Sequence, residues 1–110
     1  MFNPMTDHKV PVKLDNNAFM PVRAHATDAG ADLRTPIDLY IPAKGCVVVG
    51  TGVHVETPPG FVTLIKSKSG LNVKHSIITE GVVDEGYSGE IFVKLYNLGN
   101  KDYAFQAGDK

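Results

Sequence analysis

The segment that decides the fold is Glu90-Ile91-Phe92-Val93-Lys94-Leu95-Tyr96-Asn97. Its side chains alternate with a period of two: Ile91, Val93 and Leu95 fall on one face, and the residues between them fall on the other. Alternation of this kind places one face of a strand against a core and leaves the other toward the outside. The pattern therefore predicts a β-strand with one buried face.

Shorter β-type runs precede this strand, and eleven glycines and seven prolines punctuate the chain between them. We expect strands at residues 46–49, continuing through Val53 and Val55, and at residues 61–66. Residues 9–14 alternate weakly, and we expect a strand there that lies against a neighbouring subunit. Short strands separated by turn-forming residues are typical of an all-β barrel or sandwich.

The composition restricts the classes of function. The chain has 110 residues, the size of one domain with its own hydrophobic core, and we expect residues 1–110 to form that single domain. Eleven basic and twelve acidic residues give a net charge of −1, which favours neither nucleic acid nor an anionic membrane as a partner. The sequence has no apolar run near the ~20 residues of a membrane span and no signal-peptide core. Because a single cysteine suits a reducing compartment, we expect a cytoplasmic protein.

Three segments could carry chemistry, and the first is residues 26–33. Asp28 and Asp32 lie four residues apart around Gly30. Two carboxylates at this spacing can hold a hydrated divalent cation, or they can form an Asx-type turn at the start of a strand.

The second segment is Lys68-Ser69-Gly70-Leu71-Asn72-Val73-Lys74. It contains the only helix that the sequence predicts, a short one at residues 69–75, with Ser69 as its N-cap. The free N–H groups of a helix N-terminus can hold phosphate oxygens, and the lysines add positive charge. The alternative is a solvated basic turn.

The third segment is Gly81-Val82-Val83-Asp84-Glu85-Gly86-Tyr87-Ser88-Gly89-Glu90-Ile91. Asp84 follows two apolar residues, which predicts a partly desolvated carboxylate that can act as a base. The glycines around Tyr87 leave its ring free to lie against a flat ligand. The alternative is a glycine-rich hairpin with a tyrosine packed over it.

The remaining residues with reactive side chains show no catalytic spacing. The four histidines, His8, His25, His54 and His75, lie far apart and lack the spacing of metal ligands, so we expect surface or hydrogen-bonded positions. Cys46 lies in a valine-rich strand, and we expect it to be buried packing.

In this order, the three segments resemble the first three motifs of the trimeric dUTP pyrophosphatase (dUTPase) family. The matching residues of the first motif are Ala29-Gly30-Ala31-Asp32-Leu33, and the second and third motifs are the two segments quoted above. Residues 107–110 are similar to the approach to the fourth motif. The resemblance implies a jelly-roll-like β-barrel or sandwich subunit, all-β with one short helix, that assembles as a homotrimer with active sites at the subunit interfaces. The implied reaction is the Mg²⁺-dependent hydrolysis of dUTP to dUMP and pyrophosphate.

The resemblance also implies a role for each matching residue. Asp84 would orient and deprotonate the water that attacks the α-phosphorus, and Tyr87 would stack under the deoxyribose and exclude a 2′-hydroxyl. Asp32 would contact Mg²⁺ through water. Uracil recognition would come from main-chain groups of a hairpin at residues 77–83. The remaining residues implied in substrate binding are Lys68, Ser69 and Gly70 at the phosphates, together with Ile78, Val82, Val83 and Phe92.

The chain departs from the family pattern at three places. Ile78 replaces an asparagine that many members use on uracil, and Lys68 replaces an arginine, which exchanges a bidentate fork for a point charge. The chain also stops at Lys110, before the glutamine of the fourth motif and the glycine-rich arm that closes over the nucleotide. We therefore expect a domain truncated at its C-terminus, with weak nucleotide binding and poor turnover.

Two other functions stay open at this point. A dUTPase-fold module could serve as a regulatory or interaction domain with little activity, and the related dCTP deaminases share the fold. The presence of Asp32, Ser69, Asp84 and Tyr87 together favours the hydrolase, because a binding module needs no base.

Overall fold

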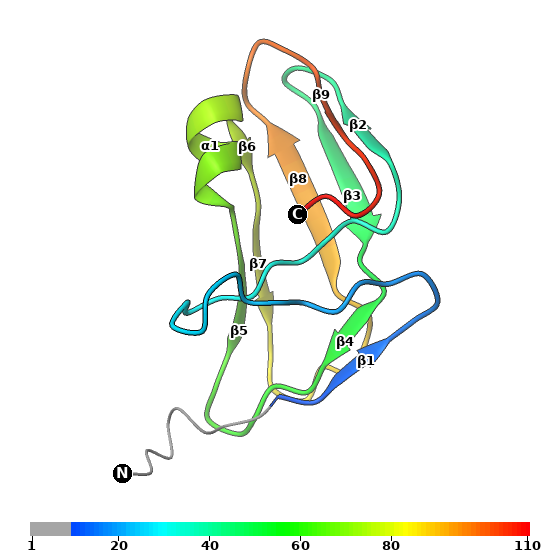
Figure 1. Ribbon diagram of the computed structural model, residues 1–110, viewed down its shortest axis with the longest axis vertical. Coiled ribbons are helices and arrows are strands. Elements are labelled where there is room, and N and C mark those ends of the chain that lie inside the picture. Colours follow the sequence, from blue (N-terminus) through cyan, green and yellow to red (C-terminus); the bar gives the residue numbers. More distant parts are fainter. Residues whose placement is uncertain (1–9) are drawn as a thin grey trace.

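The computed structural model describes residues 10–110, and it is built from short antiparallel strands and one short helix (Figure 1). The prediction of an all-β chain with a single short helix is confirmed. In chain order the elements are β1 (Val12–Leu14), β2 (Leu39–Ile41), β3 (Cys46–Gly50), β4 (Val53–Val55), β5 (Thr63–Lys66), α1 (Ser69–His75), β6 (Ile77–Ile78), β7 (Glu80–Val83), β8 (Phe92–Asn97) and β9 (Tyr103–Phe105).

Strand β8 is the middle strand of the largest sheet, whose order is β3-β8-β6. The predicted alternation is present, because Val93 is buried while Phe92 is 59% exposed. The strand begins two residues later than predicted. The reason is that the main chain of Ile91 bonds to Thr51 and to Val53 instead of to β3, with N···O distances of 3.0 and 2.8 Å.

The inward faces of the strands form one hydrophobic core. Its members are Leu39, Ile41, Val49, Val53, Ile65, Ile77, Val83, Ile91, Val93 and Phe105. The outward face of β3 and β8 carries the apolar side chains of Val48 and Phe92, both more than half exposed. Cys46 lies on this outward face, opposite Tyr96, so the prediction that it is buried is wrong. The alternation of β3 turns Cys46 outward because it turns Val49 inward.

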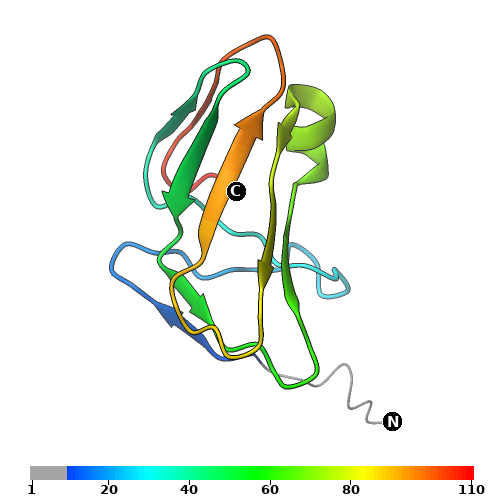
Figure 2. The same cartoon turned by 180° about the vertical axis from the view of Figure 1, so that it is seen from behind.

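Residues 77–83 do not form the predicted hairpin. Strand β6 pairs with the end of β8, whereas β7 pairs with β5, so the segment passes from one sheet to another without turning back. Figure 2 shows the two strands as one extended run beside β5. The main chain of Thr79, between them, is bound by the Ser67 hydroxyl, which donates to the Thr79 carbonyl (3.1 Å) and accepts from its N–H (2.9 Å). These two hydrogen bonds to Ser67 satisfy the main-chain groups of Thr79, which a turn would otherwise have to satisfy.

Strand β1 pairs with β4 of its own chain, from Val12 opposite Val55 to Leu14 opposite Val53. The predicted strand is therefore confirmed at residues 12–14, its contact with a neighbouring subunit stays a prediction, and Lys9 lies outside the described residues. In residues 10–110, no helix has the length and apolar character needed to cross a membrane.

The described protein is elongated, with extents of 49 × 28 × 21 Å. In Figures 1 and 2, α1 lies at one end of the β5 and β7 pair, and the loop from β7 to β8 lies at the other end, beside β4. This arrangement decides where the candidate site residues fall.

Candidate functional site

A cavity of about 880 Å³ lies between the segment at residues 28–35, strand β5 and the start of α1. It is lined by Asp28 and by four of the residues to which the family resemblance gives a role: Asp32, Lys68, Ser69 and Ile78. Its volume is in the range of small-molecule sites. Gly70 lines a smaller adjoining cavity of about 390 Å³, together with Lys68. The first and second motif segments are therefore brought together in space.

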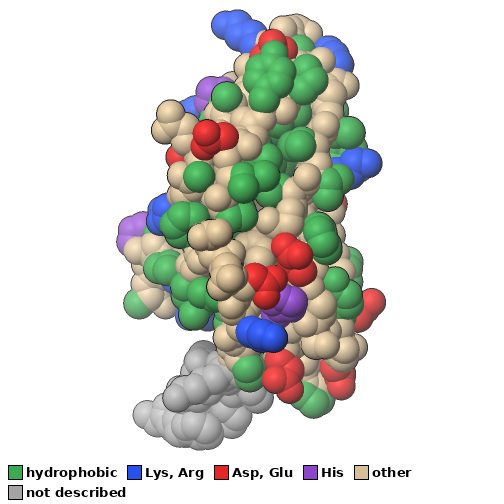
Figure 3. All heavy atoms as spheres, turned by 90° about the vertical axis from the view of Figure 1, so that its right-hand side faces the viewer, with side chains coloured by type: hydrophobic (Ala, Val, Ile, Leu, Met, Phe, Trp, Pro, Cys, Tyr) green, Lys and Arg blue, Asp and Glu red, His purple; other side chains and the backbone are tan. Residues whose placement is uncertain are grey.

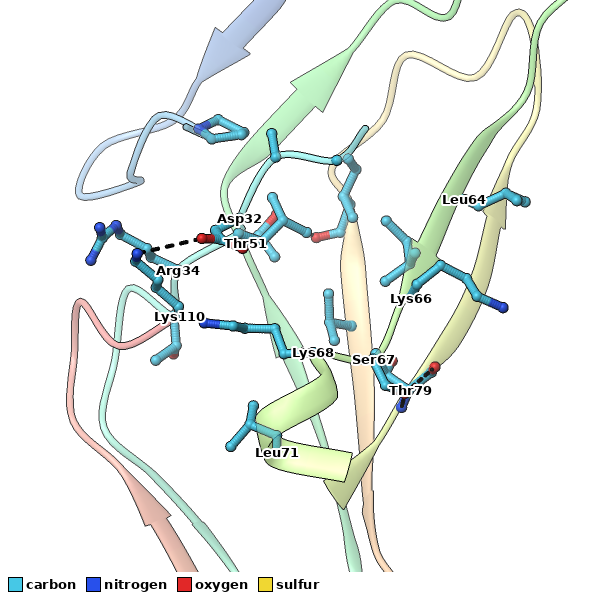
Figure 4. A pocket seen from close by; sticks show the side chains of 18 of the residues that line it. Asp32, Arg34, Thr51, Leu64, Lys66, Ser67, Lys68, Leu71, Thr79 and Lys110 are labelled. Atoms are coloured by element: carbon cyan, nitrogen blue, oxygen red, sulfur yellow. Dashed lines mark hydrogen bonds and ion pairs between the residues drawn. The ribbon is translucent and has the colours of Figure 1, made fainter. Parts of the chain in front are cut away.

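The two aspartates of the first segment have different partners. Asp28 accepts from the N–H of His25 (3.0 Å), which is the turn arrangement rather than a cation site. Asp32 faces the cavity, and its carboxylate lies 3.4 Å from the Lys110 ammonium (Figure 4). In residues 10–110, no three His, Cys, Asp or Glu side chains gather as a metal site. Asp32 therefore lines the cavity outside any such cluster of the described residues, and Asp28, Asp109 and Arg34 line it as well.

The second segment forms the predicted helix, α1, but the predicted cap is wrong. The N-cap is Lys68, with an extended backbone and no capping side chain, and Ser69 is already helical. The helix therefore starts one residue earlier than a Ser69 cap would place it, directly after Ser67, whose hydroxyl is bound to Thr79. The first intrahelical bond runs from Asn72 N to Lys68 O (2.9 Å). The N–H groups of Ser69, Gly70 and Leu71 therefore have no helical acceptor.

Two lysines at the start of this segment point in different directions. The Lys66 ammonium lies 2.6 Å from the Glu80 carboxylate on the outside of the β5–β7 pair. Lys68 has no ion-pair partner among residues 10–110. Figure 4 shows its side chain reaching across the cavity toward Arg34 and Lys110, whereas Lys66 points away from the cavity. Of these two lysines, Lys68 is the one placed to meet an anion in the cavity, which Arg34 and Lys110 also line.

The third segment forms a tight turn after β7. The Tyr87 N–H donates to the Asp84 carbonyl (3.1 Å), and Gly86 has the positive φ of 89° that closes the turn. The Asp84 side chain is exposed, so the predicted desolvation is wrong for the single chain. Of the two preceding valines, only Val83 is buried, while Val82 is 64% exposed, because neighbours in a strand face opposite sides.

The Tyr87 ring lies over the main chain of Gly89. A Cβ atom added at Gly89 would lie 2.6 Å from the Tyr87 hydroxyl oxygen, so the ring could not keep this position over any residue but glycine. The hydroxyl donates to the Glu90 carbonyl (2.7 Å), and the side chain remains 45% exposed. The loop thus holds the ring at its hydroxyl end, and an exposed aromatic ring that is fixed in this way can stack on a ligand.

Hydrogen bonds to other segments of the chain hold this loop in place, and none of them was predicted from the sequence. The N–H of Gly60 donates to Glu85 (3.2 Å), and the N–H of Gly52 donates to Glu90 (2.9 Å). Between these two, His54 in β4 contacts the Ser88 carbonyl (2.9 Å). This carbonyl, and then the Asp15 carboxylate, raise the pKa of His54 above its ordinary value.

The other described histidines occupy the positions expected of them. His25 is exposed beside Asp28, and the ring of His75 packs on Tyr103 with centroids 4.7 Å apart. His8 lies outside the described residues.

The candidate residues fall into two groups at opposite ends of the β5–β7 pair. In that ladder, Val83 lies opposite Thr63. Lys68 lies five residues beyond Thr63, a distance of about 16 Å at ~3.3 Å per strand residue. One group is Asp32, Lys68, Ser69, Gly70 and Ile78 at the cavity. The other is Val82, Val83, Asp84, Tyr87 and Phe92, none of which lines the cavity. A single chain does not bring the two groups together.

The fold and the site define a small all-β protein whose cavity is large enough for a small molecule and is lined by basic and acidic side chains. The profile of the dUTPase family matches residues 16–110. Curated relatives named deoxyuridine 5′-triphosphate nucleotidohydrolase include those of Gloeothece citriformis, 42% identical, and Clostridium acetobutylicum, 38% identical, each over 101 residues. Each alignment covers 89% of this chain and 70% of the relative. The chain belongs to the dUTPase family.

Solved structures agree with this assignment. A variant of the dUTPase of Staphylococcus bacteriophage 80alpha with dUpNHpp superposes with a TM-score of 0.86 at 26% identity, over 93% of this chain and 78% of that one. A dUTPase of phage phi11 of S. aureus, described with a structural Mg(II) ion, gives 0.86 at 27% identity, over 94% and 86%. The predicted jelly-roll-like fold class is confirmed.

Proposed function

We propose that this protein hydrolyses dUTP to dUMP and pyrophosphate. The observation that carries the proposal is the family membership, at about 40% identity to enzymes named for this reaction. It is supported by the positions of Asp84 and Tyr87, which an anchored turn presents to the outside, and by the cationic cavity at Lys68.

Asp84 is the proposed base. Its exposed carboxylate accepts a proton from a water molecule, and the water oxygen forms a bond to the α-phosphorus. The bond between that phosphorus and the oxygen bridging to the β-phosphorus breaks, and pyrophosphate leaves with the electron pair. In phosphoryl chemistry the protein contributes mainly by positioning these groups. The hydrogen bonds from Gly52, His54 and Gly60 to the loop at residues 84–91 would hold Asp84 in place for this role.

Substrate contacts are proposed from both groups of residues. Lys68 and the free N–H groups of Ser69 and Gly70 bind the phosphates. Tyr87 lies under the deoxyribose. The edge of β7 that faces away from β5 has no ladder partner among residues 10–110, which leaves main-chain groups near Ile78 and Val82 for the uracil edge. Val83 contributes only its main chain, since its side chain is in the core, and the exposed Phe92 side chain completes the proposed set.

The residues present fit a magnesium ion that is held mainly by the substrate. Mg²⁺ retains several waters and often takes one carboxylate from the protein and its other ligands from phosphates. Asp32, which lines the cavity with Asp28 and Asp109 and lies beside Lys110, would hold the ion through water. When bound, the ion would neutralise charge on the triphosphate.

The separation of the two groups supports a homotrimer in which one site draws on more than one chain. Within a chain, Lys68 and the Asp84 turn lie beyond opposite ends of the β5–β7 ladder, about 16 Å apart at the rise of an extended chain. A neighbouring copy that presents its Asp84 turn to the cavity would complete the set. Symmetric assembly repeats the same contact at each interface.

The substitution Asp84→Asn tests the reaction. Because the Asp84 side chain is exposed and forms no hydrogen bond among the described residues, the variant should fold normally. It should lose roughly a hundredfold or more in kcat for dUTP with Mg²⁺ present. The matched control is Asp102→Asn, a carboxylate on a different loop, which should keep normal turnover. Full activity of Asp84→Asn would remove Asp84 from the central role.

Mixing two variants tests the shared site. Chains carrying Lys68→Ala and chains carrying Asp84→Asn are unfolded together, refolded at equal concentrations, and assayed at low dUTP. If a site uses Lys68 of one chain and Asp84 of another, about a quarter of sites in random trimers contain both native residues. The mixture should then exceed either variant alone. A mixture that matches the mean of the two variants would contradict a shared site.

A further inference from the structure

His54 stands out because both nitrogens of its ring are engaged. Nδ1 lies 2.9 Å from the main-chain carbonyl oxygen of Ser88. Nε2 lies 3.0 and 3.1 Å from the two carboxylate oxygens of Asp15. The contacts join three separate parts of the chain: strand β4, the residue after β1, and the loop from β7 to β8.

The chemistry of these partners fixes the protonation of the ring. A carbonyl oxygen and an ionised carboxylate both accept hydrogen bonds and donate none. A neutral imidazole has one N–H and can donate to only one of them, whereas an imidazolium donates to both. The arrangement therefore matches a positively charged His54.

Both partners are themselves held in place. The β1–β4 pairing sets Lys13 opposite His54, and Asp15, two residues further on, donates its N–H to the Gly52 carbonyl (2.8 Å). Ser88 follows Tyr87, whose N–H closes the turn on Asp84. The hydrogen bond from His54 therefore reaches the segment that presents both Asp84 and Tyr87.

The charged groups around the ring come from two sides. Asp15 favours the charged imidazole and Lys13, on β1, opposes it, while the Ser88 carbonyl on the loop side favours it most. The nearby loop carboxylate, Glu90, is bound to the N–H of Gly52. In the lower half of Figure 3, over β1 and β4, a histidine side chain lies among acidic and basic ones.

We propose that His54, as an imidazolium, is a positioning residue that holds the Asp84–Tyr87 turn in place. We further propose that the turn is released when the ring loses one of its two N–H protons and becomes neutral. The proposal rests on the proposed function, because the turn matters to catalysis only if Asp84 and Tyr87 act on dUTP. His54 itself touches neither substrate nor the reacting atoms.

The first test needs no catalysis. The protein is labelled with ¹⁵N, and the His54 ring nitrogens are titrated by NMR together with order parameters for the amides of residues 84–89. We expect both ring nitrogens to stay protonated to a pH above the ordinary histidine value of about 6.5. We also expect lower order parameters for residues 84–89 in His54→Gln than in the native protein at pH values below the His54 titration, and a fall of the native values to the same level above it. Titration of His54 below that value, or an equally ordered loop in His54→Gln, would overturn the proposal.

The second test follows kcat for dUTP against pH. In the native protein, kcat should fall as pH rises through the titration of His54. In Asp15→Asn, which removes the carboxylate but keeps the size of the side chain, the midpoint of that fall should move to lower pH. His54→Gln should lack this step and turn over about tenfold more slowly at low pH. Asp102→Asn, the matched carboxylate control, should keep the native profile.

The outcomes separate the two proposals. If the native protein does not hydrolyse dUTP, the proposed function is refuted. The NMR measurements then decide alone whether His54 orders the Asp84–Tyr87 turn. Normal turnover with an unchanged midpoint in Asp15→Asn would refute the role of His54. If His54→Gln does not fold, the Asp15→Asn midpoint still decides, because a merely structural loss lowers activity at all pH values without moving the midpoint.

Discussion

The side chain of Asn97 is fully buried, and its Nδ2 amide donates to the main-chain carbonyl of Ile41, 3.1 Å away. The same amide donates to the Lys101 carbonyl (2.8 Å), and its Oδ1 accepts from the Gly99 N–H (3.0 Å). One side chain therefore satisfies three main-chain groups where β8 ends, between β2 and the loop that leads to β9. Buried polar groups of this kind are costly to leave unpaired.

We expect Asn97→Ala to lower the free energy of unfolding by roughly 3 kcal/mol, because it leaves buried main-chain groups without partners. Urea unfolding at a fixed protein concentration measures the change. The control is Asn100→Ala, an exposed asparagine in the same loop, whose effect should stay within about 0.5 kcal/mol. Equal effects of the two substitutions would show that burial of Asn97 does not matter.

Gly89→Ala should displace the Tyr87 ring. The new Cβ would lie 2.6 Å from the ring hydroxyl and 2.7 Å from Cζ, too close for the ring to keep its place. We expect KM for dUTP to rise about tenfold with a smaller change in kcat, since the ring binds the sugar rather than the reacting phosphorus. For stability, Gly30→Ala is the control, because nothing lies within 4 Å of an added Cβ there. An unchanged KM would contradict the stacking role of Tyr87.

Lys66 and Lys68 provide a matched pair for phosphate binding. Lys66 is occupied by Glu80 on an exposed surface, and such pairs contribute about 0–1 kcal/mol. Lys68 points into the cavity without an ion-pair partner among residues 10–110. We expect Lys68→Ala to raise KM for dUTP about tenfold and Lys66→Ala to leave it unchanged. Because salt screens the attraction between a lysine and a phosphate, the effect of Lys68→Ala should be smaller at higher ionic strength. Steady-state kinetics at two ionic strengths measure both effects. A larger rise in KM for Lys66→Ala than for Lys68→Ala would contradict the assignment.

The pair of Tyr40 and Asp102 gives a prediction about pH. The hydroxyl of Tyr40 donates to the Asp102 carboxylate, and this bond, followed by one from the Ala43 N–H, lowers the pKa of Asp102 below its ordinary 3.8. A lowered pKa in the folded state contributes stability above the unfolded pKa, and that contribution is lost as pH falls through the folded pKa.

We therefore expect Tyr40→Phe to lower Tm by about 2 °C at neutral pH and by progressively less as pH falls below about 3.8. Differential scanning calorimetry across this range measures the difference. Tyr96→Phe is the control, since the Tyr96 hydroxyl has no hydrogen bond among the described residues. A difference that grows toward acid pH would contradict the assigned direction.

The parts of the fold that the sequence predicts are those that depend on neighbours along the chain. The alternation at residues 90–97 decides which side chains of β8 are buried, and the helix at residues 69–75 has the predicted bounds. The family motifs also place Asp32 and Lys68 on one cavity.

Features set by distant contacts were not predictable in this way. The expected hairpin at residues 77–83 fails because Ser67, twelve residues before Thr79, binds the main chain where a turn would be. Cys46 was misplaced because the choice of inner face depends on the partner strand. The position of His54 depends on Asp15 and Ser88, which are 39 and 34 residues away in sequence. No local pattern marks such a residue.

The outward face of β3 and β8 sets a condition on how the protein reaches its working form. Val48 and Phe92 stand there uncovered by any described segment, so a newly folded chain carries an apolar surface into crowded solution. Assembly with folded copies of the same chain then competes with aggregation onto partly folded chains, and the rates of both processes rise with protein concentration. The yield of functional protein from a cell depends on which encounter comes first.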